Sequence, residues 1–156
     1  MKIIDGGVTA AKGFKAAGMH AGIKKGTKKD MAMIVSSAPC MAAGTFTTNL
    51  VKAAPVKWDQ HVVYEHGEAR AVVVNSGIAN ACTGAEGYGY CEETAKAAAE
   101  ALGIDKDEVL VASTGVIGKQ LPIDTIKKGV KDLSGLLLDT REAATLAAES
   151  IMTGCR

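Results

Sequence analysis

The sequence predicts an α/β protein in which helices are layered on a sheet. Two apolar runs of strand type, residues 71–74 and 109–112, are each followed by glycine, hydroxyl and amide residues and then by helical periodicity. Strand, helix, strand and helix therefore alternate across residues 70–152, which is typical of a layered α/β fold. A chain of 156 residues has the size of one domain, so we expect residues 1–156 to form a single domain.

The first third of the chain is expected to contribute strands joined by turns. The lysine-rich residues 24–30 predict a solvated turn between two strands, because charge runs usually face water, and an anionic-ligand site is the alternative. The apolar residues 31–36 predict a strand, and residues 37–40 predict a turn. Residues 42–49 are rich in β-branched side chains and predict a further strand. Its polar stripe either faces solvent or lines a cleft: Thr45, Thr47 and Asn49.

The middle of the chain alternates between strand and helix patterns. After Pro55 the pattern is unclear until residues 70–74, which lack polar alternation and so predict a strand covered on both faces. Residues 87–102 carry apolar side chains at helical spacing and predict a helix, and Gly103 stands where a left-handed cap would end it. Residues 108–112 predict the next strand.

Two more helices are expected in the last quarter of the chain. Pro122 is well placed to start a helix that runs to about Leu133, since proline is favoured at the first helical position. Asp139 followed by Glu142 resembles a capping box that opens a final helix through Ile151.

Composition argues against several classes of protein. The formal net charge of +1 gives no electrostatic reason to expect nucleic acid or acidic membranes as partners. No window approaches 18 uninterrupted apolar residues, and residues 1–7 lack the apolar stretch of a signal peptide, so we expect a cytoplasmic protein. The four cysteines form no C-x-x-C pair and no metal-type spacing with histidine, so we expect buried or incidental thiols and no metal: Cys40, Cys82, Cys91 and Cys155.

The chain is rich in small residues and poor in aromatic ones. It contains 26 alanines and 18 glycines but only six aromatic side chains. Small side chains pack closely but each buries little apolar area. We therefore expect another element to complete the core.

The chemistry-bearing feature is the pair of segments N-S-G-I-A-N-A-C-T-G at residues 75–84 and S-T-G-V-I-G at residues 113–118. Hydroxyls and backbone N–H groups at a strand end can hold negative charge, and glycine lets the backbone approach a ligand. The Thr114 hydroxyl and the Gly115 N–H can present two donors to one point, as an oxyanion requires, although S-T-G is also a common turn. Neither segment contains an obvious nucleophile or base.

The same glycines fit nucleotide-binding motifs poorly. Residues 84–89 read G-x-x-G-x-G, the reverse of the dinucleotide order, and do not directly follow a strand. Gly115 and Gly118 are separated by two residues where a phosphate loop has four, and Gln120 replaces the magnesium-binding Ser or Thr. A small anion- or nucleotide-binding α/β module is therefore the less favoured reading.

The two segments, read as N-S-G-I-A-N-A-C-T-G and V-L-V-A-S-T-G-V-I-G, resemble the amino-terminal part of the ArgJ family. These are the glutamate N-acetyltransferases, or ornithine acetyltransferases, of arginine biosynthesis. Five other stretches match in order, so that the resemblance covers essentially the whole chain: residues 6–10, 12–14, 46–49, 51–55 and 148–153. The resemblance implies the α-chain part of the DmpA/ArgJ-like fold.

The resemblance also implies a mechanism. In the family, the precursor cuts itself before an internal threonine, which becomes the amino terminus of a β chain and the acetyl-carrying nucleophile. Acetyl moves from N-acetylornithine to this threonine and then to glutamate, without a cofactor, and some members also accept acetyl-CoA as a substrate. The family's oxyanion hole corresponds here to Thr114 and Gly115, and the implied assembly is an α₂β₂ heterotetramer.

This sequence departs from the family pattern at several positions. Ile78 stands where the family usually has asparagine, and Ala11 replaces a frequent proline. The family's T-T-D-T is here T-G-C-R at residues 153–156, which leaves Thr153 as the one substrate-contact match. The segment with the cleavage point and the nucleophilic threonine does not occur in the sequence. We therefore expect this chain alone to be inactive; a truncated product with only folding or partner-binding capacity is the alternative.

Overall fold

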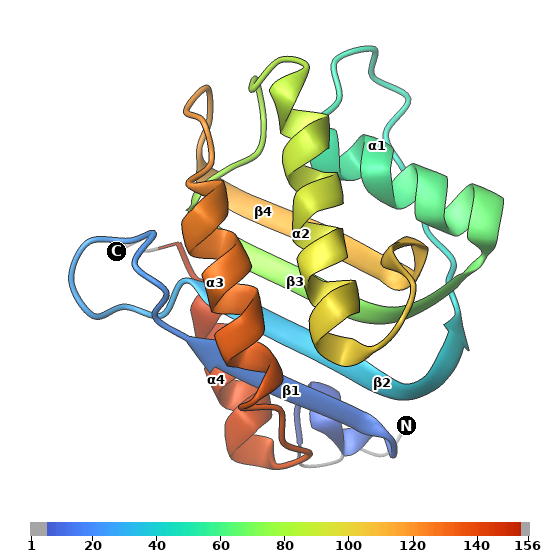
Figure 1. Ribbon diagram of the computed structural model, residues 1–156, viewed down its shortest axis with the longest axis vertical. Coiled ribbons are helices and arrows are strands. Elements are labelled where there is room, and N and C mark those ends of the chain that lie inside the picture. The colour runs from blue at the N-terminus through green and yellow to red at the C-terminus, as the bar shows by residue number, and fades with distance from the viewer. Residues whose placement is uncertain (1–5, 154–156) are drawn as a thin grey trace.

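The computed structural model describes residues 6–153, and its order of elements confirms the α/β class. Four strands form one sheet in the order β1-β2-β3-β4, with antiparallel pairing from β1 to β3 and parallel pairing between β3 and β4 (Figure 1). The strands are β1 Phe14–Met19, β2 Met31–Met41, β3 Glu68–Ile78 and β4 Val109–Val116. The helices are α1 Ala54–His61, α2 Glu86–Leu102, α3 Ile123–Ser134 and α4 Arg141–Ile151. Three short turns complete the chain: the 3₁₀ turns η1 Val8–Ala10 and η3 Lys106–Glu108, and the π-helical turn η2 Val62–His66.

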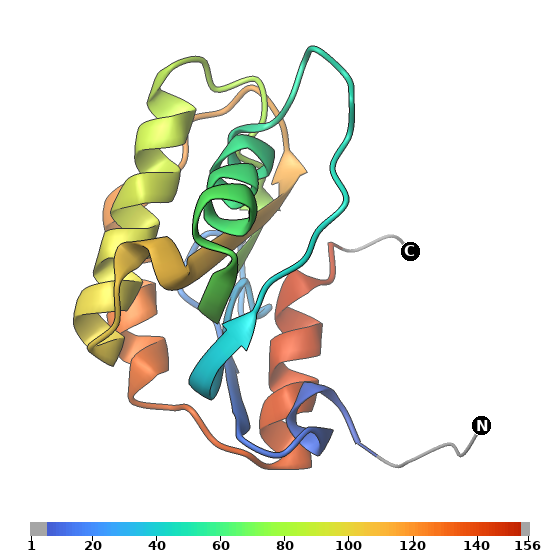
Figure 2. The same cartoon turned by 90° about the vertical axis from the view of Figure 1, so that its right-hand side faces the viewer.

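Helices α1, α2 and α3 cover one face of the sheet, and α4 lies on the other face over β1 and β2 (Figures 1 and 2). The main core lies under the three helices and includes the fully buried side chains of Trp58, Met33 and Ile126. The Trp58 indole N–H donates to the Val109 carbonyl at 2.8 Å, which satisfies its one polar atom inside the core. A smaller cluster lies under α4 and is built mainly from alanine and valine side chains: Ala16, Ala32, Val74 and Ala147.

The first third of the chain differs from its sequence prediction. Residues 24–30 do form a turn between two strands, but the predicted turn at residues 37–40 lies inside β2, where the register shifts between Val35 and Cys40. The strand predicted over residues 42–49 is wrong, since these residues are irregular. Met41 pairs with Glu68, the first residue of β3, so no strand remains for the following residues to pair with. The polar stripe faces solvent, with three exposed members: Thr45, Thr47 and Asn49.

The second half of the chain follows its prediction closely. Helix α2 ends at Gly103 in the left-handed conformation, with φ of 67°, and α3 begins directly after Pro122. The capping residue of α4 is Thr140 rather than Asp139, because the Thr140 hydroxyl accepts a hydrogen bond from the Ala143 N–H at 3.2 Å. An N-cap must have an extended backbone with its side chain turned back to the first helical turn, and Thr140 has that conformation.

The sequence pattern missed α1 and the π-helical turn that follows it. Their buried residues are Ala54, Pro55, Trp58 and Val62, which repeat at intervals of three and four and so carry a helical signal. The signal is weak because the helix is short and no side chain caps its first turn. Gly67, with φ of 73°, ends the π-helical turn and leads into β3.

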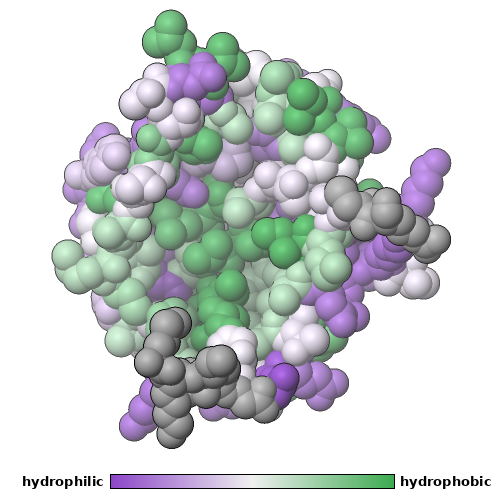
Figure 3. All heavy atoms as spheres, turned by 180° about the vertical axis from the view of Figure 1, so that it is seen from behind, coloured by the Kyte–Doolittle hydropathy of each residue, from purple (hydrophilic) through white to green (hydrophobic). Residues whose placement is uncertain are grey.

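Part of the sheet remains uncovered on the side of α4. The prediction that residues 70–74 are covered on both faces holds for Val73 and Val74 but not for Val72, which is half-buried. Beyond α4, apolar side chains line a depression of about 240 Å³ that includes Ile34, Val72 and Leu110. Figure 3 shows apolar atoms gathered in the middle of this face. We call this area the open apolar face.

No helix within residues 6–153 has the length and apolar character needed to span a membrane.

Asp59 is expected to make the protein less stable as pH rises. Its Oδ1 accepts from the Val111 N–H at 3.0 Å, yet burial raises its pKa from 3.8 to about 6, with the Val111 hydrogen bond opposing that rise. Between these two pH values the folded state holds more protons than the unfolded state. The contribution of Asp59 to the free energy of unfolding is therefore fully present below pH 3.8 and is lost as pH rises through about 6. Asp59→Asn keeps an acceptor oxygen and removes the cost of ionisation. After allowance for partial exposure, we expect it to stabilise the chain by about 1 kcal/mol at pH 8 and by almost nothing at pH 4.

Urea unfolding at several pH values measures this effect. Asp124→Asn, at an exposed aspartate of α3, is the control and should leave the pH dependence unchanged. Equal effects of Asp59→Asn at pH 4 and pH 8 would contradict the assignment.

Candidate functional site

The two glycine-containing segments lie side by side as the ends of the parallel strands β3 and β4. Ser76 pairs with Thr114, Gly77 with Gly115, and Ile78 with Val116. The first residues of the two segments therefore belong to β3 and β4 themselves. This corrects the expectation that a turn to a helix begins directly at each segment. The carboxyl ends of neighbouring parallel strands are a common position for ligands in α/β sheets.

Gly115 is required by its close approach to the neighbouring strand. Its φ is 132°, and a Cβ at this position would lie 2.3 Å from the Gly77 carbonyl carbon and 2.7 Å from the Ile78 nitrogen. Both atoms belong to the backbone of β3, so neither can move aside as a flexible side chain could. A space lined by Gly77 and by the end of β4 lies at these strand ends.

That space is an open pocket of about 510 Å³, and it contains all three site residues predicted from the sequence. It is lined by Lys24, Lys28, Gly77, Thr114, Gly115, Val116 and Thr153. The half-buried Thr114 hydroxyl has no hydrogen-bond partner among residues 6–153, so it is available as a donor. The roles of Thr114 and Gly115 as oxyanion donors, and of Thr153 as a substrate contact, stay predictions.

The two lysines of the pocket come from the turn between β1 and β2, which Asp30 holds in place. The fully buried Asp30 carboxylate accepts hydrogen bonds from four successive backbone N–H groups, those of Ala21, Gly22, Ile23 and Lys24, at 2.6 to 3.2 Å. The Lys24 ammonium donates to the Lys29 carbonyl and to the Met152 carbonyl, at 3.0 and 2.7 Å. The turn thereby places its lysines beside Thr153 at the end of α4.

The pocket has a positive electrostatic character. Burial lowers the pKa of Lys24 below its ordinary value, Asp30 partly offsets this effect, and the charge of Lys28 lowers it further. No carboxylate, imidazole or thiol is among the described residues that line the pocket. The arrangement can attract and hold an anion, and it offers no general base of its own.

Asp30→Asn is expected to destabilise the chain and to disturb the lysine-bearing turn. The amide keeps one acceptor oxygen but turns an NH₂ donor toward backbone N–H groups, which leaves at least one buried donor unpaired. The expected cost is about 2 kcal/mol in the free energy of unfolding. Urea unfolding measures it, and Asp132→Asn on the exposed side of α3 is the control. A loss no larger than that of the control would show that the carboxylate does not organise the turn.

Most polar side chains of the first segment serve the fold rather than the pocket. The buried Asn80 amide donates to the Gly87 carbonyl at 2.8 Å and to the Cys91 sulfur at 3.3 Å, and its oxygen accepts from the Thr83 hydroxyl. Asn75 donates to the Ile78 carbonyl at 2.8 Å. The Ile78 side chain is itself buried in the main core, so it does not line the pocket. The Asn80 contacts attach the first segment to α2. Of residues 75–84, only Gly77 lines the pocket.

Three of the four cysteines lie in the described part of the chain, and only Cys91 is buried. Cys40, Cys82 and Cys91 are free, and Cys155 lies outside the described residues with the rest of 154–156. Burial raises the pKa of the Cys91 thiol to about 12, Asp59 adds to this rise, and the Asn80 hydrogen bond opposes it. Cys91 is therefore an unreactive core residue at neutral pH.

The fold and the site together define an α/β protein with an anion-attracting pocket at the ends of two parallel strands. The model of the ArgJ family matches residues 15–155. The chain therefore belongs to the ArgJ family. It is 52% identical over 150 residues to the arginine biosynthesis bifunctional protein ArgJ of Gloeobacter violaceus, covering 96% of this chain and 36% of that protein. It is 51% identical over 155 residues to the protein of the same name from Symbiobacterium thermophilum, covering 98% of this chain and 38% of that one.

Solved structures of the family have the same fold. The arginine biosynthesis bifunctional protein of Bacillus halodurans superposes with a TM-score of 0.91 at 42% identity, covering 98% of this chain and 78% of that one. The ornithine acetyltransferase of Mycobacterium tuberculosis, solved with ornithine, superposes with a TM-score of 0.92 at 44% identity. The match covers 97% of this chain and 81% of that one. The chain spans little more than a third of the length of the curated relatives it matches.

Proposed function

We propose that this chain is the α portion of a glutamate N-acetyltransferase and ornithine acetyltransferase of arginine biosynthesis. In this proposal it supplies the oxyanion hole, and a β segment supplies a threonine nucleophile. The observation that carries the proposal is the pocket that gathers Thr114, Gly115 and Thr153 beside two lysines. The names of the relatives, including an ornithine acetyltransferase that binds ornithine, support the choice of substrates.

The proposed reaction has two halves. The hydroxyl of the β-segment threonine attacks the acetyl carbonyl of N-acetylornithine, and its proton passes to the threonine's own amine. The carbonyl oxygen becomes an oxyanion that accepts hydrogen bonds from the Thr114 hydroxyl and the Gly115 N–H. Collapse of this intermediate breaks the C–N bond, the proton passes to the leaving nitrogen, and ornithine departs. The glutamate amine then attacks the acyl-threonine, the ester C–O bond breaks, the amine proton passes to the threonine oxygen by way of its amine, and N-acetylglutamate departs.

Lys24 and Lys28 support this chemistry electrostatically. Both substrates carry carboxylates, and the intermediate carries an additional negative charge. Cationic groups at the pocket favour binding of the substrate carboxylates and the negative charge that develops during attack. Acetyl-CoA, an anion as well, is a further acetyl donor in this proposal, and no cofactor is needed.

The open apolar face supports the proposed partner. Apolar side chains of the sheet remain accessible on the side of α4, in a chain whose core is rich in small residues. A β segment packed on this face would bury them and complete the core, as two halves of one layered domain do. We propose that the assembly is an α₂β₂ heterotetramer in the cytoplasm, formed after autocatalytic cleavage.

The decisive experiment purifies the chain from its native source and identifies what accompanies it by intact-mass analysis. We expect a partner that begins with threonine. We expect acetyl transfer from N-acetylornithine to glutamate in the complex and none in the isolated 156-residue chain. Transfer by the isolated chain would contradict the division of the active site. Absence of partner and of activity would favour a product with only folding or partner-binding capacity, and binding of ATP or NAD by calorimetry would favour a nucleotide module.

A further inference from the structure

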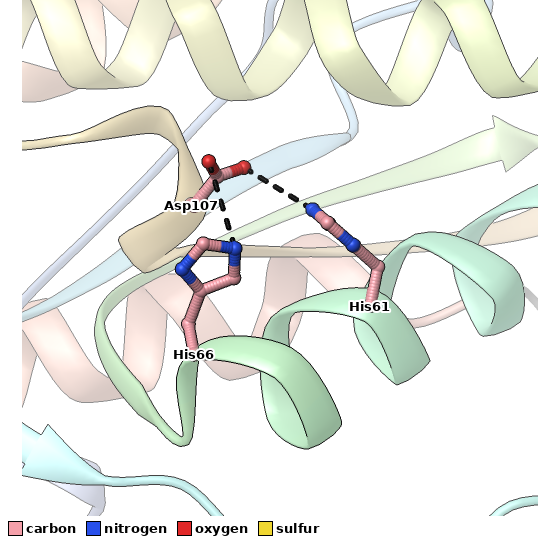
Figure 4. A group of neighbouring side chains, drawn as sticks. All are labelled: His61, His66 and Asp107. Atoms are coloured by element: carbon pink, nitrogen blue, oxygen red, sulfur yellow. Dashed lines mark ion pairs between the residues drawn. The ribbon is translucent and has the colours of Figure 1, made fainter.

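Two histidines and an aspartate converge at the end of the molecule opposite the pocket. They are His61 at the end of α1, His66 at the end of the π-helical turn, and Asp107 in η3 (Figure 4). Asp107 precedes β4 and Thr114 lies near its other end, so about 20 Å of strand separates this cluster from the pocket. The cluster is thus independent of the proposed acetyl transfer.

The π-helical turn is what brings the two histidines together. In an α-helix, residues five apart point about 140° away from each other. Here the Gly67 N–H donates to the Val62 carbonyl at 3.0 Å, which closes an i to i+5 turn, and the rings of His61 and His66 come within 5.1 Å of each other. Such turns occur frequently at functional sites.

The distances in the cluster suit a metal ion better than direct hydrogen bonds. His61 Nε2 lies 3.6 Å from Asp107 Oδ1, and His66 Nε2 lies 3.7 Å from Asp107 Oδ2. Both separations exceed ordinary hydrogen-bond lengths. One candidate ligand atom from each of the three residues lies within 4.8 Å of the others. Ligand atoms bound at about 2.1 Å to one ion lie about 3 to 4 Å apart, so modest shifts would let all three reach a common ion.

Neighbouring groups orient the candidate ligands. The Glu65 carboxylate lies 3.0 Å from His61 Nδ1 and thereby directs the opposite ring nitrogen toward Asp107. The Asp107 N–H donates to the Asp105 carboxylate at 2.9 Å, within a capping box that fixes η3. The Lys106 ammonium lies 2.7 Å from Asp107 Oδ1 and competes for that oxygen. These contacts hold His61 and Asp107 in position, and Lys106 competes with an incoming cation for the Asp107 carboxylate.

From this geometry we propose that His61, His66 and Asp107 form a site for a divalent transition-metal ion such as Zn²⁺, Ni²⁺ or Co²⁺. Two imidazoles and one carboxylate suit these ions, whereas Mg²⁺ and Ca²⁺ prefer oxygen ligands only. Three protein ligands leave a coordination position for water, and the partly exposed side chains give the ion access from solvent. A bound ion would tie α1 and the π-helical turn to the segment that enters β4.

The single tryptophan gives a direct readout of binding. Trp58 is the only tryptophan of the chain, and its ring lies 5.9 Å from the ring of His61. We expect Ni²⁺ or Co²⁺ to quench Trp58 fluorescence in a saturable titration of the tag-free 156-residue chain. Zn²⁺, which has a filled d shell, should displace these ions and restore the fluorescence.

Three variants test whether the cluster binds a metal ion or only forms ion pairs between the histidines and Asp107. His66→Gln should weaken the affinity for Ni²⁺ by at least about tenfold, because a ligand is lost. His20→Gln changes the one histidine outside the cluster and should leave the affinity unchanged. Lys106→Gln removes the competing ammonium and should tighten binding. Circular dichroism of each variant verifies folding.

The proposal is overturned by a linear, unsaturable loss of fluorescence. It is also overturned by equal affinities of the His66→Gln and His20→Gln variants, since Ni²⁺ would then bind elsewhere. If neither Lys106→Gln nor His66→Gln changes the affinity for Ni²⁺ relative to the parent chain, Ni²⁺ also binds elsewhere and the proposal fails.

Discussion

Thr114→Ala is expected to lower kcat for acetyl transfer by about 10²- to 10³-fold in the proposed complex of this chain with a nucleophile-bearing β segment. The half-buried hydroxyl lies in the pocket and has no other hydrogen-bond partner among the described residues, so its loss removes the donor that the proposed mechanism assigns to the oxyanion. The KM for N-acetylornithine should change little, because the oxyanion exists only during attack.

Thr114→Ser retains the hydroxyl and is the matched control, with an expected kcat within a few-fold of the parent. Steady-state kinetics of all three proteins tests the assignment. If Thr114→Ala and Thr114→Ser lower kcat equally, the effect comes from packing at the end of β4 and the oxyanion role fails.

Gly115→Ala should strongly destabilise the fold. A Cβ would lie 2.3 to 2.7 Å from three backbone atoms of Gly77 and Ile78, and the φ of 132° is itself unfavourable for alanine. Overpacking against backbone and the unfavourable φ together predict a loss of about 3 to 5 kcal/mol in the free energy of unfolding. The parallel strands would have to separate at the pocket, so acetyl transfer should be lost as well.

Gly118→Ala separates the two causes of this loss. Gly118 also has a positive φ, of 74°, but nothing lies within 4 Å of the position that its Cβ would occupy. We expect this control to lose only about 1 kcal/mol, the cost of a left-handed alanine. Urea unfolding of both variants provides the comparison, and equal losses would rule out the close approach of the strands as the cause.

Local patterns in the sequence were sufficient for the second half of the fold. The spacing of apolar residues in α2, the left-handed Gly103 and the position of Pro122 each depend on neighbours in the chain, and each was predicted correctly. One failed prediction depended on a distant partner. Residues 42–49 have strand-like composition but no strand to pair with, since β3 begins opposite Met41.

The cluster of His61, His66 and Asp107 illustrates the same limit. His61 and His66 stand five residues apart, a spacing that an α-helix would place on different faces, and Asp107 follows 41 residues later. Only a π-helical turn and the packing of η3 beside it bring the three side chains together. The expectation of no metal was drawn from the spacing of cysteines with one another and with histidine, which does not test a site made of histidine and aspartate.

By itself, the sequence determined the α/β class, the resemblance to the ArgJ family and the choice of Thr114 and Gly115, because strand and helix periodicities and short motifs are local properties of the chain. Only the tertiary structure decided that Gly115 lies against Gly77, that Lys24 and Thr153 reach the same pocket, and that Asn80 and Ile78 turn toward the core. These facts depend on strand register and on how a turn and a helix end pack against the sheet. Such contacts join residues far apart in the chain, and no local pattern records them.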